Sequence, residues 1–71
     1  MQKMRSNLTD ESLIDMLYIT NDSGFSDRYF YLLIKKNEFP PPIKFGRSSR
    51  WLLKEYSAWK ARHIFLRNKK E

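Results

Sequence analysis

Basic and hydroxyl side chains occur together in two short segments of this 71-residue chain, residues 26–36 and 47–50. Guanidinium, ammonium and hydroxyl groups donate hydrogen bonds to phosphate oxygens, and an arginine can also bond a guanine edge through two donors. The two segments therefore indicate binding of DNA rather than catalysis. The candidate DNA-binding residues are Ser26, Arg28, Tyr29, Tyr31, Lys35, Lys36, Arg47, Ser48, Ser49 and Arg50.

Most other chemistries lack the residues that they need. The chain has no cysteine, so disulfides and thiolate metal sites are excluded. Its single histidine, His63, has no second ligand at metal spacing, and there is neither a nucleophile–base pair nor a phosphate-binding loop. We therefore expect no catalytic residues, no metal and no cofactor, and we predict that the protein is not an enzyme.

Positive charge is concentrated in one part of the chain, whose net charge is +6. Residues 1–25 carry two basic and four acidic side chains, whereas residues 26–71 carry twelve basic and four acidic ones. This asymmetry predicts one basic face that suits a polyanion such as double-stranded DNA.

The length and the apolar pattern indicate one small domain inside the cell. No apolar run approaches the roughly 20 residues that cross a bilayer, and the N-terminus lacks the apolar core of a signal peptide. We expect no membrane contact and a cytoplasmic, nucleoid-associated location in a bacterium. The predicted organisation is a flexible arm over residues 1–12, a folded domain over 13–67 and a charged tail over 68–71.

Two short helices are predicted around a tight turn. An extended entry over residues 13–16 leads into a helix over 17–23, and Gly24 suits the left-handed position that ends a helix. Ser26 is a good N-cap for a second helix over 27–36. That helix ends where Asn37 can adopt the left-handed conformation and the three following prolines prevent further helix.

A basic hairpin and a third helix follow. Residues 43–45 and 50–52 read as short strands around a turn over 46–49, and a helix is predicted from Lys54 to about Arg67. The fold class is therefore mainly α with a small β-hairpin, in the order of a winged helix-turn-helix. The expected buried stripe of the third helix is Leu52, Tyr56, Trp59, His63 and Leu66.

Each predicted DNA contact has a role in this arrangement. Arg28, near the start of the second helix, is the best candidate for a base contact in the major groove. Tyr31 can bond a phosphate or pack on a thymine methyl, whereas Tyr29 is ambiguous between groove and core. The remaining candidates are phosphate or minor-groove contacts, with the arginines suited to a narrow minor groove. They are Lys35, Lys36, Arg47, Ser48, Ser49 and Arg50.

Several residues allow more than one interpretation. Trp51 and Trp59 could stack on single-stranded bases, but both fall on stripes predicted to be buried, so we expect core packing. Ile64 and Phe65 lie off the main stripe of the third helix, where they either contact a partner or form the edge of the core. The arm over residues 1–12 either orders on DNA or stays disordered.

An ordered series of residues resembles the AlpA-type regulators and small excisionases of prophages and integrative islands, over about residues 13 to 62. The resemblance implies a winged helix-turn-helix of the MerR/excisionase-like kind and binding of attachment-site or promoter DNA. The residues that carry it are Gly24-Phe25-Ser26, Tyr31, Leu33-Ile34-Lys35, Glu38-Phe39-Pro40, Lys44-Phe45-Gly46, Trp51 and Trp59.

The resemblance also assigns places to single residues. It implies that Ser26 is the helix N-cap, that Tyr31 and Lys35 lie on the recognition helix, and that the turn after Gly46 is the wing. The chain departs from the pattern at Asn37, where the family usually has glycine. It departs again at Asp27, where a basic or small residue is common; an acidic group there either accepts a hydrogen bond from a cytosine amine or serves the start of the helix.

Three functions are compatible with these features. The first is an excisionase, or recombination directionality factor, that binds and bends attachment-site DNA and assists a tyrosine-type integrase in excising a prophage or genomic island. The second is an AlpA-like transcriptional regulator of an integrase or phage gene. The third is a protein-interaction adaptor. For the first two, the partners are double-stranded DNA and further copies of the chain that associate cooperatively on it.

Overall fold

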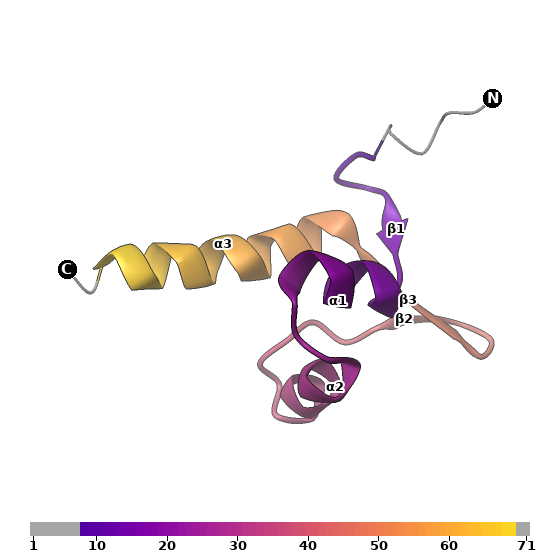
Figure 1. Ribbon diagram of the computed structural model, residues 1–71. Coiled ribbons are helices and arrows are strands. Elements are labelled where there is room, and N and C mark those ends of the chain that lie inside the picture. The colour runs from indigo at the N-terminus through magenta and orange to yellow at the C-terminus, as the bar shows by residue number, and fades with distance from the viewer. Residues whose placement is uncertain (1–7, 70–71) are drawn as a thin grey trace.

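A computed structural model describes residues 8–69 of the protein, which form three helices and three strands (Figure 1). Residues 1–7 of the predicted arm and 70–71 of the predicted tail lie outside the described residues. The mainly helical chain with a small antiparallel sheet agrees with the predicted class at this level and is compatible with a winged helix. The elements are β1 (Leu13–Ile14), α1 (Met16–Ser23), α2 (Asp27–Lys35), β2 (Ile43–Phe45), β3 (Ser48–Leu52) and α3 (Leu53–Lys69).

The strands form one antiparallel sheet in the order β1-β3-β2. The sequence predicted the β2–β3 hairpin, but it predicted only an extended entry where β1 lies. β1 pairs with the end of β3, which places Ile14 opposite Trp51 and buries both. Two residues are too few to show an alternating pattern, so only the distant pairing partner identifies this strand.

The segment before β1 holds the start of α3. The carbonyl oxygens of Ser12 and Asp10 accept hydrogen bonds from the backbone N–H groups of Leu53, at 2.8 Å, and Lys54, at 3.1 Å. The first N–H groups of a helix have no partner within the helix, so these bonds satisfy two of them. The Lys54 ammonium also bonds the Glu11 carboxylate at 3.0 Å, which raises the pKa of Lys54.

The predicted tight turn joins α1 to α2. Asp15 caps α1 by accepting a hydrogen bond from the backbone N–H of Tyr18 at 2.9 Å, and the helix begins one residue earlier than predicted. Gly24 ends α1 with φ of 84° and donates its N–H to the Thr20 carbonyl at 2.8 Å. The prediction of a left-handed glycine at this position is confirmed.

Both ends of α2 carry the predicted caps. The Ser26 hydroxyl accepts a hydrogen bond from the backbone N–H of Tyr29 at 3.2 Å. Asn37 has φ of 62° and donates its N–H to the Ile34 carbonyl at 3.0 Å. The helix itself ends at Lys35, one residue before the predicted end.

Aromatic rings fill much of the core beneath the helices. The indole of Trp51 donates to the Pro40 carbonyl at 2.9 Å, and that of Trp59 donates to the Glu38 carbonyl at 3.1 Å. Trp59 also packs edge-on against Phe39, with ring centroids 5.1 Å apart. Both tryptophans thus hold the loop after α2, and the prediction that they pack in the core rather than on bases agrees with this structure. The buried side chains are Ile14, Ile19, Phe30, Leu33, Phe39, Trp51 and Tyr56.

A polar contact joins the end of α1 to α3. The Tyr56 hydroxyl donates to the Asp22 carboxylate at 2.6 Å, and the Lys60 ammonium donates to the same oxygen at 2.7 Å. The bonds from Lys60 and Tyr56 lower the pKa of Asp22. Burial, together with the Asp22 carboxylate, raises the pKa of Tyr56 beyond its ordinary range.

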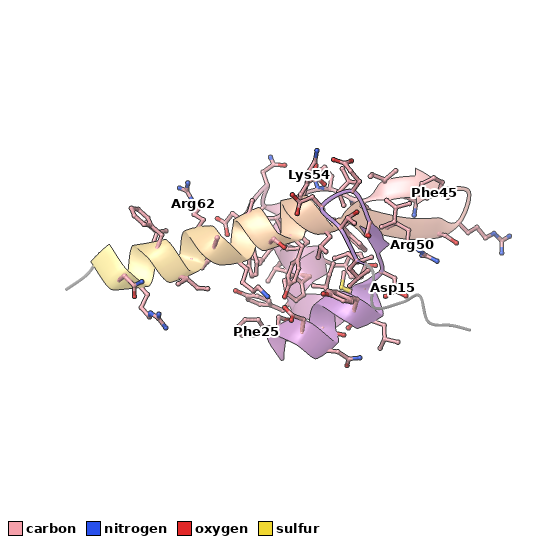
Figure 2. All side chains as sticks on the ribbon, turned by 90° about the horizontal axis from the view of Figure 1, so that it is seen from above. Asp15, Phe25, Phe45, Arg50, Lys54 and Arg62 are labelled. Atoms are coloured by element: carbon pink, nitrogen blue, oxygen red, sulfur yellow. The ribbon has the colours of Figure 1, made fainter. Side chains whose placement is uncertain are left out.

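The second half of α3 extends past the body of the protein (Figures 1 and 2). Tyr56 is buried and Trp59 is half-buried, but His63 and Leu66 are exposed. The predicted buried stripe is therefore wrong in its second half. A helix rises about 1.5 Å per residue, so α3 is longer than the helices it packs against. The helical spacing of the predicted stripe therefore continues past the point where the core ends.

Candidate nucleic-acid interface

One face of α2 lies open to solvent, opposite the two residues that this helix buries. Helical residues follow one another at about 100°, so Arg28, Leu32 and Lys35, spaced i, i+4 and i+7, lie on this side. All three are exposed. Tyr31, with 47% of its surface exposed, lies at the edge of the same face. We call these four residues the outer face of α2.

The other predicted contacts of α2 lie at its margins. The Tyr29 ring packs on Phe25 with centroids 4.7 Å apart, on the side where it also lines a groove with Ile64 of α3. Tyr29 thus lies apart from the outer face. Ser26 stands before the first turn, where its oxygen is used as the cap and its hydrogen can still be donated. Lys36 is exposed just after the last turn.

Leu32 is the residue of this face that sequence reasoning missed. Its side chain is 52% exposed although it stands among charged and polar neighbours. The same periodicity that assigned the buried stripe of α2 places Leu32 on the opposite side, so the signal was present in the sequence.

The hairpin turn is shorter than predicted. Gly46 and Arg47 alone form it, and Ser48 and Ser49 belong to β3, so the predicted turn over residues 46–49 is wrong in its second half. Gly46 has φ of 65°. A two-residue hairpin with glycine first suits a type II′ turn, whose twist matches that of the strands.

The polar residues of the hairpin divide between its two faces. Because side chains alternate along a strand, Ser48 and Arg50 lie on one face and Ser49 on the other. Lys44 pairs with Ser49 in the register and donates to its hydroxyl at 2.8 Å. Arg50 donates to the neighbouring Ser49 carbonyl at 2.9 Å. Arg47 lies at the tip, so the hairpin offers three positive charges on different sides.

The basic residues of α2 and the hairpin keep their charge uncompensated. Among the side chains of residues 8–68, the two ion pairs join Lys54 to Glu11 and Lys60 to Asp22, and neither involves α2 or the hairpin. Positive groups that have no acidic partner stay available to external anions. The exposed basic residues of these elements are Arg28, Lys35, Lys36, Lys44 and Arg47, and Arg50 is half-buried.

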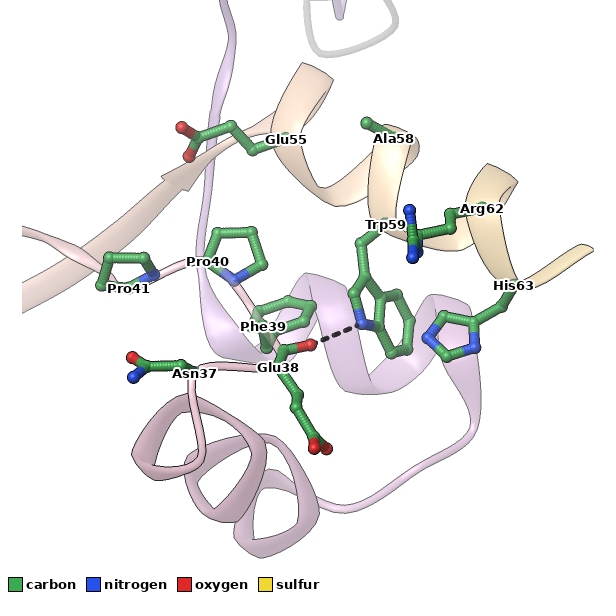
Figure 3. Close-up of a pocket in the computed structure, with 10 residues that line it drawn as sticks. All are labelled: Asn37, Glu38, Phe39, Pro40, Pro41, Glu55, Ala58, Trp59, Arg62 and His63. Atoms are coloured by element: carbon green, nitrogen blue, oxygen red, sulfur yellow. Dashed lines mark hydrogen bonds between the residues drawn. The ribbon is translucent and has the colours of Figure 1, made fainter. Parts of the chain in front are cut away.

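A groove of about 760 Å³ lies between α3 and the loop after α2 (Figure 3). Phe39, Trp59 and His63 line it, on the core side of α2 and away from the outer face. Within residues 8–69, no three histidine, cysteine or acidic side chains are placed to hold a metal ion. No helix in this part of the chain is long and apolar enough to cross a membrane.

Similarity to known proteins decides the family of this chain. The protein is 30% identical, over 57 residues, to the probable excisionase hkaC of Shigella phage Sf6 and to the response regulator inhibitor for tor operon of Escherichia coli K12. Each match covers 80% of this chain and 86% of the relative. The chain belongs to the family of AlpA-type regulators and small excisionases.

Membership in the AlpA and excisionase family confirms the resemblance drawn from the sequence. An uncharacterized protein, ORF88 of Enterobacteria phage P4, is 34% identical over 59 residues, which cover 82% of this chain and 67% of that protein. None of these names is that of an enzyme. Neither a family model nor a solved structure matches the chain.

Proposed function

We propose that this AlpA-family protein binds double-stranded DNA as a winged helix-turn-helix. α2 enters the major groove with its outer face toward the bases, and the β2–β3 hairpin acts as the wing beside it. Arg28 bonds a base edge, Tyr31 lies next to it, and the lysines at the end of α2 bond phosphates. Arg47 at the hairpin tip bonds the adjacent backbone or minor groove.

One observation carries this proposal. α2 and the hairpin expose basic residues that have no acidic partner among the side chains of residues 8–68, whereas Lys54 and Lys60 of α3 are paired. A surface kept positive in this way suits the phosphate backbone, whose counterions such groups displace. Among the proposed contacts, Ser48 and Arg50 share one hairpin face. Ser49 lies on the other face, where either its hydroxyl or the Lys44 ammonium that bonds this hydroxyl contacts the DNA.

Within this function, we propose that the protein is an excisionase. It binds and bends attachment-site DNA, loads cooperatively with further copies, and assists a tyrosine-type integrase in excising a prophage or genomic island. The relatives named as probable excisionases support this assignment. An AlpA-like role in transcription uses the same surface and is the alternative.

A nuclease-protection footprint and an excision assay test the assignment together. The footprint uses the attachment site of the element that encodes the protein, and the excision assay uses its integrase. We expect protection beside the integrase sites and excision that depends on this protein. Protection confined to a promoter, with excision unaffected, would assign the protein to transcription instead.

The second candidate function is inhibition of a regulatory protein by direct contact. Two observations favour it: a relative named as a response regulator inhibitor, and the end of α3, where Ile64 and Leu66 are each nearly half exposed. This surface is separate from the outer face of α2. Ile64→Glu should then abolish inhibition and leave DNA binding intact, whereas Arg28→Ala should do the reverse.

A further inference from the structure

Leu32 is the one aliphatic side chain on the outer face of α2, and 52% of its surface is exposed. Arg28 precedes it by one turn, and Lys35 follows it by three residues, so charged groups flank it along the helix. The buried positions of α2 are filled by Phe30 and Leu33 on the opposite side. Leu32 therefore has no role in this core that would explain an apolar residue here.

The outer face of α2 meets base edges if the proposed function is right, and the following inference rests on that function. Among the four standard bases, thymine alone presents a methyl group in the major groove. Contact between an exposed leucine and such a methyl group is favourable, because both apolar surfaces leave water. We propose that Leu32 contacts a thymine 5-methyl and is a specificity-determining residue of this protein.

The position of Leu32 predicts where that thymine lies. Four residues of helix span about 6 Å, and base pairs in DNA are about 3.4 Å apart. The thymine covered by Leu32 therefore lies within about two base pairs of the base bonded by Arg28. Arg28 and Leu32 together select a short element that combines a guanine with a nearby thymine.

Replacement of thymine by deoxyuridine tests this contact, because it removes the methyl group and leaves base pairing unchanged. A binding site is first selected from random duplexes with the full-length protein, and each thymine is then replaced singly. Removal of one buried methyl costs about 0.8 kcal/mol, which is about fourfold in affinity. We expect one position, within two base pairs of the Arg28 contact, to show this loss with the wild-type protein.

Leu32→Ala should bind the thymine site about fourfold more weakly and should no longer distinguish thymine from deoxyuridine at that position. Alanine favours helix more than leucine does, so the variant should keep its fold, which circular dichroism checks. Ile64→Ala is the matched control: Ile64 is 47% exposed on α3, and its removal should leave the fourfold distinction unchanged.

Other results would overturn either the Leu32 contact alone or the proposed DNA binding as well. If Leu32→Ala still distinguishes thymine from deoxyuridine as the wild type does, or if no thymine responds in the wild type, the contact is overturned and the proposed DNA binding stands. If the wild-type protein selects no duplex, the proposed function is overturned and the contact with it.

Discussion

Asp22 accepts two hydrogen bonds at one oxygen, from the Tyr56 hydroxyl at 2.6 Å and from the Lys60 ammonium at 2.7 Å. Tyr56 is 1% exposed and lies in the aromatic core. A hydroxyl buried there without a partner would destabilise the fold. At the scale of single residues, Asp22 thus fixes the end of α1 onto α3.

The ionisation of Asp22 should make this contact depend on pH. The bonds from Lys60 and Tyr56 lower its folded-state pKa below the ordinary value of 3.8. Its contribution to the free energy of unfolding is therefore fully present above pH 3.8 and is lost as the pH falls through the lower folded value. Denaturant titrations of wild type and Asp22→Asn should differ near neutral pH and converge in acid. A difference that persists unchanged in acid would contradict this role for the carboxylate.

Arg28 and Arg47 should differ in the kind of affinity that they supply. Arg28→Ala should cost about 1–3 kcal/mol at the specific site and relax sequence preference, because it removes a base contact. Arg47→Ala is the matched control, since it removes the same charge from a backbone contact and should weaken all sequences alike. Fluorescence anisotropy on specific and scrambled duplexes measures both effects. Unchanged discrimination in Arg28→Ala would show that another residue selects the base.

At the scale of elements, α2 is bounded by residues that act locally. Ser26 caps its start, and Asn37 follows its end in the left-handed conformation. Because each of these signals involves only a few neighbouring residues, the sequence predicted the helix and its turn closely. In the proposed complex, the order in which α2 residues contact the bases depends on these same two ends, since the caps set which residues face outward.

Ser26 combines a structural and a proposed binding role, and two substitutions separate them. Ser26→Ala removes the cap and should lower the free energy of unfolding by about 1 kcal/mol. Ser26→Asp keeps a capping oxygen and suits the helix dipole, so stability should stay close to wild type. Its negative charge should nevertheless weaken DNA binding, because it would face a phosphate. Wild-type affinity in Ser26→Asp would mean that this position caps the helix and contacts no phosphate.

Elements that depend on distant contacts were harder to predict. β1 is two residues long, and its identity rests on pairing with a strand nearly forty residues later in the chain. The apolar positions at the end of α3 continue a helical period, so His63 and Leu66 had the same pattern as Tyr56 but a different exposure. A sequence pattern predicts which residues share one face of a helix, whereas the length of the protein body beneath that face decides how many of them are buried.

The candidate site was predicted unevenly for the same reason. Exposure of Arg28 and Lys35 follows from the helical period alone, and Leu32 could have been found from it as well. The separation of Ser49 from Ser48 and Arg50 depends on a two-residue turn, which moves both serines into β3. A prediction of the hairpin that placed four residues in the turn could not assign these side chains to faces.

At the scale of the whole molecule, the ion pairs lie along α3, whereas the basic residues of α2 and the hairpin have no acidic partner among the described side chains. Two acidic residues of the N-terminal third, Glu11 and Asp22, pair with lysines at the start and in the middle of α3. The hairpin and the exposed end of α3 project in opposite directions (Figure 1). This arrangement separates the surface proposed for DNA from the surface available to a protein partner.

Salt dependence of DNA binding measures how many of these charges contact phosphate. With about four or five contacts from α2 and the hairpin, the logarithm of the association constant should fall against the logarithm of salt concentration with a slope of about −4. Lys35→Ala should reduce the magnitude of that slope by about 1, because it removes one phosphate contact. Arg62→Ala, on the projecting half of α3 (Figure 2), removes the same charge and should leave the slope unchanged. A slope near zero in the wild type would contradict binding to the DNA backbone. An equal change of slope in Lys35→Ala and Arg62→Ala would mean that net charge rather than the α2 surface governs affinity.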